Sequence, residues 1–188
     1  MKTLAAALLA VAFTAAHAEP ASYIVDTTHA AVFYEIDHFG TSTNRGRFPV
    51  TAGTVQLDRA ARSGRAEITI DVAAVNTGVP ALDRRLAGKD FFNAAEFPTG
   101  SFVAERFGFS GDKVAEVAGQ LTLQGKTNPV TLKAIHFNCY TNPLFKREVC
   151  GGDFETTVQR SLWGVSWGLN AGFAGAVRLL VQIEAIKQ

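Results

Sequence analysis

The sequence contains few of the residues from which metal and redox centres are commonly built. Only two of its 188 residues are cysteines and only four are histidines. Cys139 and Cys150 have ten residues between them, and no Cys-x-x-Cys motif is present to depress the pKa of a thiol. His29, His38 and His136 have no paired spacing that would bring them to one metal ion. The sequence therefore predicts no metal site, and it disfavours a redox-active dithiol.

The chain also lacks an excess of charge of either sign. Lys2 is the only charged residue among the first 18, and without it the chain has 17 basic and 17 acidic residues. A nucleic-acid partner would need a basic surface that displaces counterions from phosphate. No nucleic-acid partner is therefore expected.

The apolar run near the start is too short to cross a membrane. Residues 4–16 are mostly Ala, Leu, Val and Phe, whereas a spanning helix needs about 20 residues. The run follows Lys2 and ends in Ala16-His17-Ala18, which has the small-x-small form of a signal peptidase site. We therefore predict a signal peptide over residues 1–18, cut after Ala18, rather than a membrane anchor. The rest of the chain, residues 19–188, has the length of a single domain and no expected transmembrane segment.

Most of the remaining sequence alternates between apolar and polar residues. Ala66, Ile68, Ile70 and Val72 would share one face of a strand, because successive side chains of a strand point to opposite sides. The same period of two recurs in residues 32–38, 54–57, 114–123, 154–160 and 178–186. Many such segments joined by turns indicate an antiparallel sheet, closed as a barrel or stacked as a sandwich. The expected inward residues are Val32, Tyr34, Ile36 and His38 in segment 32–38, Ala115, Val117, Gly119, Leu121 and Leu123 in segment 114–123, and Leu179, Val181, Ile183 and Ala185 in segment 178–186.

Three places interrupt this pattern. Gly40, Asn44 and Gly46 predict a turn after the first strand. Residues 80–88 predict one short helix, because a proline suits the first helical turn and a glycine suits the end. The glycine-rich segment 162–175 contains Trp163 and Trp167; packing of a loop is expected there, and a mobile cover over a cavity is the alternative.

Two cysteines in an exported chain most often form a disulfide, so Cys139 and Cys150 are expected to be bonded. By closing a small loop, this bond would restrict the unfolded chain and so stabilise the fold by about 2 to 3 kcal/mol.

Phe91 and Phe92, which follow the predicted helix, are expected to pack between the helix and the sheet. Contact of this pair with a ligand is the alternative.

Four sequence blocks in order resemble the YceI family of exported proteins. They are the strand over residues 26–38 with Arg45-Gly46-Arg47-Phe48, the block Asp90-Phe91-Phe92 leading to Phe97-Pro98 and Phe102, the block Leu121-Thr122-Leu123-Gln124-Gly125, and the block Pro129-Val130-Thr131-Leu132. The resemblance implies an extended antiparallel eight-stranded barrel, similar to that of lipocalins, that holds a polyisoprenoid lipid or an isoprenoid quinone. The segment from Cys139 to Cys150 further resembles the periplasmic branch, which implies a location in the periplasm. The chain differs from the family's common residues at Ala30, Gln124 and Lys126, so polar contacts to a ligand headgroup are expected to differ.

The sequence and the resemblance together predict an all-β barrel with one short helix that binds an apolar small molecule without covalent attachment. The interior of an eight-stranded barrel can be filled by side chains or can hold one small ligand, and burial of an apolar tail needs no directional groups. The tail is expected to lie along the barrel axis, with Trp163 and Trp167 bordering the opening. A homodimer is left open. The expected ligand contacts are Tyr34, Ile36, His38, Ile68, Ile70, Phe102, Trp163, Trp167, Leu179, Val181 and Ile183.

Two other function classes compete with this interpretation. An enzyme could use Tyr34 and His38 as general acid and base, with Asp37 or His136 beside them. Residues four apart on a strand are separated by about 13 Å, which is too far to share one proton, so no enzyme is expected. The second alternative is a scaffold or envelope-stress protein without a ligand, whose packed core would leave a similar sequence pattern.

Overall fold

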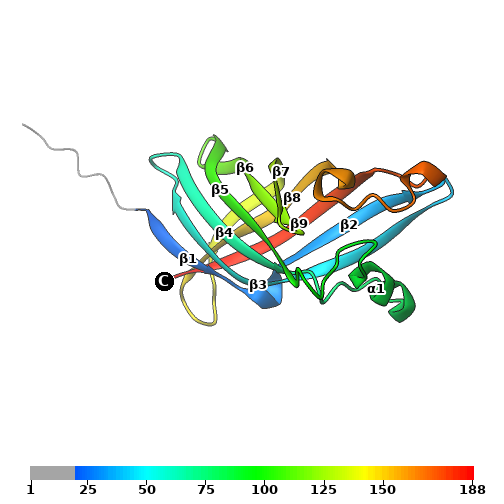
Figure 1. Cartoon of the computed structure of the whole chain (residues 1–188). Coiled ribbons are helices and arrows are strands. Elements are labelled where there is room, and N and C mark those ends of the chain that lie inside the picture. Colours follow the sequence, from blue (N-terminus) through cyan, green and yellow to red (C-terminus); the bar gives the residue numbers. More distant parts are fainter. Residues whose placement is uncertain (1–19) are drawn as a thin grey trace, which may run out of the picture.

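The computed structural model describes residues 20–188, and the predicted signal peptide and its cleavage site lie outside the described residues. Strands make up most of the described chain, and the predicted short helix is present (Figure 1). The elements are β1 (Ala21–Val25), the 3-10 helix η1 (Thr27–His29), β2 (Ala31–His38), β3 (Ser42–Asp58), β4 (Ser63–Asp71), α1 (Pro80–Ala87), β5 (Thr99–Ser110), β6 (Lys113–Leu123), β7 (Lys126–Thr141), β8 (Glu148–Gln159), the 3-10 helices η2 (Arg160–Trp163) and η3 (Leu169–Ala171), and β9 (Ala176–Lys187).

The nine strands form one closed antiparallel sheet with eight strand positions. The order is β1-β3-β2-β9-β8-β7-β6-β5-β4, and pairing of β3 with β4 closes the ring. β1 and β2 occupy one position, because both lie between β3 and β9. β1 pairs with the second half of β3, whereas β2 pairs with its first half. The predicted eight-stranded barrel is therefore confirmed.

The break between β1 and β2 was not expected from the sequence. Asp26 follows the last residue of β1, and its Oδ1 accepts a hydrogen bond from the backbone N–H of Thr28 at 2.9 Å. This capping begins the turn of η1, so residues 26–29 are not part of a continuous strand. A short polar side chain that bonds to a nearby backbone N–H competes in this way with sheet pairing.

The predicted turn after β2 is shorter than the sequence indicated. The chain turns at residues 39–41, where Gly40 has φ +68°, and Asn44 and Gly46 already lie in β3. Gly46 pairs with Tyr34, and a Cβ at position 46 would lie 2.6 Å from Cε1 of that tyrosine. This glycine therefore allows the Tyr34 ring to lie across β3, and it does not form the turn.

One inward face was also predicted wrongly. In β6 the buried residue near the start is Val114, not Ala115, which is only partly buried. The pairs Gly108–Glu116 and Phe109–Val114 leave Ala115 without a partner. This β-bulge reverses the side to which the preceding residues point. After the bulge the expected alternation holds, and Val117 and Leu121 are buried.

The two ends of the barrel differ in structure. Figure 1 shows α1 and the connection between β8 and β9 at the same end as the β2–β3 turn; we call this the α1 end. The β3–β4, β5–β6 and β7–β8 hairpin turns lie at the opposite end, which we call the hairpin end. α1 has Pro80 in its first turn, and the N–H of Gly88 bonds to the Arg85 carbonyl at 3.1 Å where the helix ends. The short helix and its end points are as predicted.

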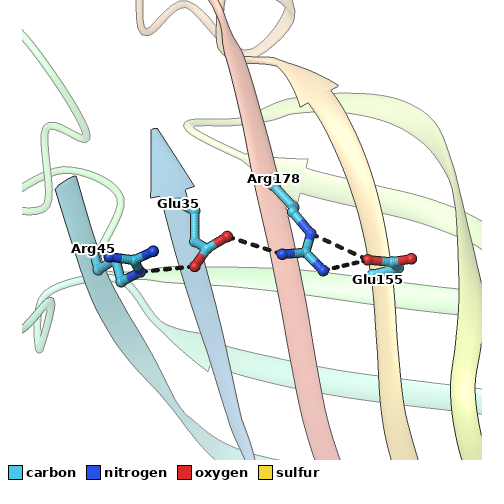
Figure 2. A network of polar contacts seen from close by, with 4 residues as sticks. All are labelled: Glu35, Arg45, Glu155 and Arg178. Carbon is cyan, nitrogen blue, oxygen red and sulfur yellow. Dashed lines mark hydrogen bonds and ion pairs between the residues drawn. The ribbon is translucent and has the colours of Figure 1, made fainter. Parts of the chain in front are cut away.

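Ion pairs connect four neighbouring strands on the outer surface. Figure 2 shows Arg45 of β3, Glu35 of β2, Arg178 of β9 and Glu155 of β8 in one row. Nε of Arg45 lies 2.8 Å from Glu35, and Arg178 lies 3.0 Å from Glu35 and 2.6 Å from Glu155. The hydrogen bonds from Arg45 and then Arg178 lower the pKa of the Glu35 carboxyl. Because both partners of each pair are at least partly exposed to solvent, each pair is worth at most about 1 kcal/mol.

Candidate ligand-binding cavity

The inward faces of the strands enclose a cavity of about 110 Å³, which we call the apolar cavity. Apart from the Tyr23 hydroxyl and the Cys150 sulfur, the side chains that line it are hydrocarbon. It forms because β4, β5, β6 and β9 each direct one apolar face to the barrel axis. Its lining residues are Tyr23, Val32, Val55, Leu57, Ala66, Ile68, Ile70, Phe102, Phe107, Val114, Val117, Leu121, Val130, Leu132, Phe137, Cys150, Gly151, Phe154, Leu179, Val181, Ile183 and Ala185.

A second cavity of about 310 Å³ adjoins the first toward the α1 end. Leu121 and Leu179 line both cavities, so the two share a boundary. We call the second one the aromatic cavity, because six aromatic side chains of Phe and Trp line it. Its lining residues are Tyr34, Ile36, His38, Asn44, Phe48, Leu82, Arg85, Leu86, Phe91, Phe92, Leu121, Leu123, Val158, Arg160, Trp163, Val165, Trp167, Phe173, Val177 and Leu179.

All the residues that the sequence suggested as ligand contacts lie on the wall of one or the other cavity. They fall into two groups, and Leu179 belongs to both. The apolar cavity contains Ile68, Ile70, Phe102, Val181 and Ile183, and the aromatic cavity contains Tyr34, Ile36, His38, Trp163 and Trp167. Contact of these residues with a ligand remains a prediction.

Sequence reasoning missed the contribution of the segment around α1. For Phe91 and Phe92 packing was the preferred expectation and contact with a ligand was the alternative; both residues line the aromatic cavity. They also pack: Phe92 lies 5.1 Å from Phe48, and Phe91 lies 5.4 Å from Trp167, between ring centroids. Alternation within a strand could not identify them, because they come from an irregular connection. The pair of adjacent phenylalanines was the one available signal.

Arg160 anchors the glycine-rich connection that carries both tryptophans. Its guanidinium is buried and donates to three backbone carbonyls, those of Val165, Trp167 and Ala174, at 2.8 to 2.9 Å. No carboxylate forms an ion pair with it within residues 20–188. Burial lowers the pKa of this guanidinium. The arginine thus folds the connection against the end of the barrel.

The two tryptophans have different surroundings. Trp163 is 2% exposed, and its Nε1–H donates to the Leu121 carbonyl at 2.9 Å. Trp167 is partly exposed and packs against its neighbours: the Arg85 guanidinium lies 4.5 Å from its ring centroid, and the Phe173 centroid lies 4.9 Å away. Both rings line the aromatic cavity. A ligand ring placed there would therefore lie close to two fluorescent side chains.

Tyr34 carries the one hydroxyl among the side chains that line the aromatic cavity. Burial raises the pKa of Tyr34 to about 12, so the phenol stays protonated at neutral pH. Within the described part of the chain, no hydrogen bond to this hydroxyl is formed, and none joins Tyr34 to His38. The His38 ring instead packs against Phe39 at 5.1 Å. Tyr34 can therefore donate a hydrogen bond to a group inside the cavity, but it is a poor proton acceptor.

The sequence matches a model of the YceI-like domain over residues 23–185. This range contains every strand from β2 to β8 and most of β1 and β9. The chain belongs to the YceI family.

Relatives of this YceI-family chain have similar length and fold. UPF0312 proteins of Pseudomonas aeruginosa and Pseudomonas fluorescens are each 33% identical to it, and the matches cover 100% of this chain and 98% of each relative. The crystal structure of Burkholderia cenocepacia BcnA superposes with a TM-score of 0.69 at 26% identity, over 85% of this chain and 98% of that one. A structure described as a polyisoprenoid binding domain from Saccharophagus degradans superposes with a TM-score of 0.58 at 12% identity, over 90% of this chain and 100% of that one.

Polar side chains lie beside the apolar cavity at the hairpin end of the YceI barrel. The Tyr23 hydroxyl donates to Glu148 at 2.7 Å, and Arg59 and Lys187 lie 3.2 and 3.4 Å from the same carboxylate. The hydrogen bond from Tyr23 is the main reason why the pKa of the Glu148 carboxyl is lowered. Tyr23 thus directs its hydroxyl to this carboxylate while it also lines the cavity.

The predicted disulfide is present at this end. Cys139 of β7 and Cys150 of β8 are directly paired in the sheet and bonded to each other. With Glu148 they form the one group of potential metal ligands found among residues 20–188, but both sulfurs are used in the disulfide. In the same part of the chain, no helix is both long and apolar enough to cross a membrane.

Proposed function

We propose that this protein is a binding protein for an isoprenoid quinone, with the tail in the apolar cavity and the ring in the aromatic cavity. The observation that carries the proposal is the order of the two cavities along the barrel. One is lined by hydrocarbon, and the adjoining one adds flat rings and a few polar groups. A quinone with a prenyl tail has the same two parts in the same order.

The tail is suited to the apolar cavity because its binding needs no directional contacts. Burial of hydrocarbon contributes about 0.8 kcal/mol per CH₂ group. A branched prenyl chain would contact Ile68, Phe102 and Val181, which come from three different strands. A polar chain would instead lose its hydrogen bonds with water and find almost no partner there.

The ring is suited to the aromatic cavity because a quinone combines a flat π-system with two carbonyl acceptors. Trp163 and Trp167 offer stacking surfaces, and the protonated Tyr34 hydroxyl can donate to a carbonyl oxygen. This donor is the reason to prefer a quinone to a purely hydrocarbon polyprenoid. The name of the Saccharophagus degradans domain adds a precedent for a polyisoprenoid in a barrel of this fold.

The same features favour binding over catalysis. Tyr34 is already protonated at neutral pH, because burial raises its pKa to about 12, and His38 packs on Phe39 without bonding to that tyrosine. We propose carriage or storage of the quinone in the periplasm. A scaffold without a ligand is the competing function, and it predicts that the cavities stay unoccupied in the cell.

Titration with a long-chain ubiquinone tests the proposal through tryptophan emission. We expect quenching, because the quinone ring would lie near Trp163 and Trp167, and no quenching by a saturated alkyl chain. Val181→Phe should weaken binding by filling the apolar cavity, whereas Leu180→Phe, on the outer face of the same strand, should not. Native mass spectrometry of protein purified from the cell envelope, followed by solvent extraction, should recover an isoprenoid. Flat emission together with an extract free of isoprenoid would refute the proposal and favour the scaffold.

A further inference from the structure

The tip of the β7–β8 hairpin exposes two large apolar side chains. Leu144 is 88% exposed and Phe145 is 41% exposed. Figure 1 shows this yellow hairpin projecting beyond the neighbouring strands near the C-terminal end of the chain. Such side chains at the end of a protruding loop stabilise neither the core nor the sheet, so they are candidates for contact with a partner.

The hairpin holds these side chains in a defined conformation. The N–H of Asn142 bonds to the Arg147 carbonyl at 2.9 Å, and the N–H of Lys146 bonds to the Asn142 carbonyl at 2.9 Å. Oδ1 of Asn142 also accepts from the N–H of Leu144 at 2.9 Å. The disulfide joins the two strands three residues before the first of these bonds. The tip is therefore preorganised, which reduces the entropy lost when it binds.

The charges next to the apolar tip are basic. Lys146 and Arg147 follow Phe145 directly, and within residues 20–188 neither forms an ion pair. The Arg147 guanidinium lies 5.6 Å from the Phe145 ring centroid. The nearest acidic residue in the sequence, Glu148, is already paired with Arg59 and Lys187. The tip thus combines an apolar end with adjacent positive charge.

We infer that the β7–β8 hairpin docks this protein on an anionic lipid surface, with Leu144 and Phe145 inserted among the acyl chains and Lys146 and Arg147 at the phosphate groups. Apolar side chains flanked by basic ones are typical of segments that bind at the interface of an anionic membrane. A stable protein interface buries about 800 Å² on each partner, which is more than two side chains of the size of Leu144 and Phe145 can supply. The inference does not depend on the identity of the ligand.

Docking in this way would turn the hairpin end of the barrel toward the bilayer. β7 and β8 also line the apolar cavity, through Phe137 of one strand and Cys150 of the other. The surface that contacts lipid would then lie beside the cavity proposed for a lipid tail. The α1 end, with the aromatic cavity, would face away from the membrane.

Sedimentation with vesicles tests the inference on the full protein. We expect binding to vesicles of phosphatidylcholine and phosphatidylglycerol, weak binding to pure phosphatidylcholine, and a decrease with added salt. The variant L144S/F145S should bind at least about tenfold more weakly, because both inserted side chains are lost. K146Q/R147Q should lose about fivefold for each charge removed. Two variants serve as matched controls. L162S changes a leucine that is 54% exposed, and R84Q/K89Q removes two exposed charges of the α1 end.

Unchanged binding of L144S/F145S, or absence of wild-type binding to the anionic vesicles, would overturn the inference. If the hairpin variant instead changed the sedimentation coefficient of the free protein, the tip would be a contact between two copies of the chain, which also contradicts lipid docking. Thermal melting and quinone titration of each variant show whether the barrel and its cavities are intact. Loss of vesicle binding with normal quinone titration would support the inference. Failure of the quinone titration in the wild type would count against the proposed function only.

Discussion

Replacement of Arg160 by methionine should loosen the connection between β8 and β9 and destabilise the whole barrel. The side chain is 9% exposed and donates to the carbonyls of Val165, Trp167 and Ala174. Methionine retains the apolar bulk but cannot donate, so all three carbonyls lose their charged partner. The substitution therefore removes the hydrogen bonds without leaving a large cavity.

The size of the effect follows from two opposing contributions. A hydrogen bond from a charged group contributes about 1.5 to 3 kcal/mol, so three of them would give a large total. Removal of a buried guanidinium to which residues 20–188 supply no carboxylate partner regains part of its desolvation cost. We expect a net loss of about 3 kcal/mol in the free energy of unfolding. For a chain of this length, that loss lowers the melting temperature by about 6 to 12 °C.

Thermal and urea unfolding, followed by tryptophan emission, measure this loss. Arg160→Lys is the matched control: it keeps the charge but reaches fewer of the three carbonyls, so its melting temperature should be intermediate. Hydrogen exchange of residues 164–175 should also accelerate in Arg160→Met, because these residues lose their anchor. A variant that melts within about 2 °C of the wild type, with unchanged exchange, would refute the reasoning.

Three further predictions concern the wall and the hairpin end of the barrel. Val181→Asp should cost about 4 kcal/mol of unfolding free energy, because it places an unpaired charge in the apolar cavity. Gln182→Asp, on the outer face of the same strand, should cost little. Equal melting temperatures of the two variants would mean that the faces of β9 are reversed. Mass measurement with and without reductant should show Cys139 and Cys150 bonded, and replacement of both by serine should cost about 2 to 3 kcal/mol; two free thiols in exported protein would contradict this. Glu148→Gln should be less stable than the wild type at neutral pH. The difference should begin to shrink as the pH falls below the ordinary glutamate pKa of about 4.3, and it should vanish once the pH lies below the lower pKa of the folded state. The sign follows because the hydrogen bond from Tyr23 lowers the pKa of Glu148 in the folded state. The stability that the carboxylate contributes is therefore present above the pKa of the unfolded state and is lost as the pH falls through the pKa of the folded state. A stability difference that does not depend on pH would exclude the carboxylate charge as its cause.

Much of the barrel was predictable because strand alternation is local. Ile68 and Ile70 lie on the inward face of β4, and Val181 lies on that of β9, as their period of two indicated. The short helix followed from Pro80 and Gly88 for the same reason, since helix ends depend on nearby residues. The four YceI-like blocks then selected a barrel over a sandwich, which alternation alone left open.

The sequence by itself thus determined six of the nine strands, most of their inward faces, the helix and the family. Only the tertiary structure decided the features that depend on contacts between distant segments. The bulge at Ala115 depends on how β6 pairs with β5, and the need for glycine at position 46 depends on the ring of Tyr34 across the strand pair. Closure of the sheet and the size of the side chains on facing walls set the space between those walls, so cavities could not be inferred from any one strand. Arg160 meets the carbonyls that it binds only after the connection has folded over the barrel end, because its partners lie in an irregular segment with no periodic pattern to place them.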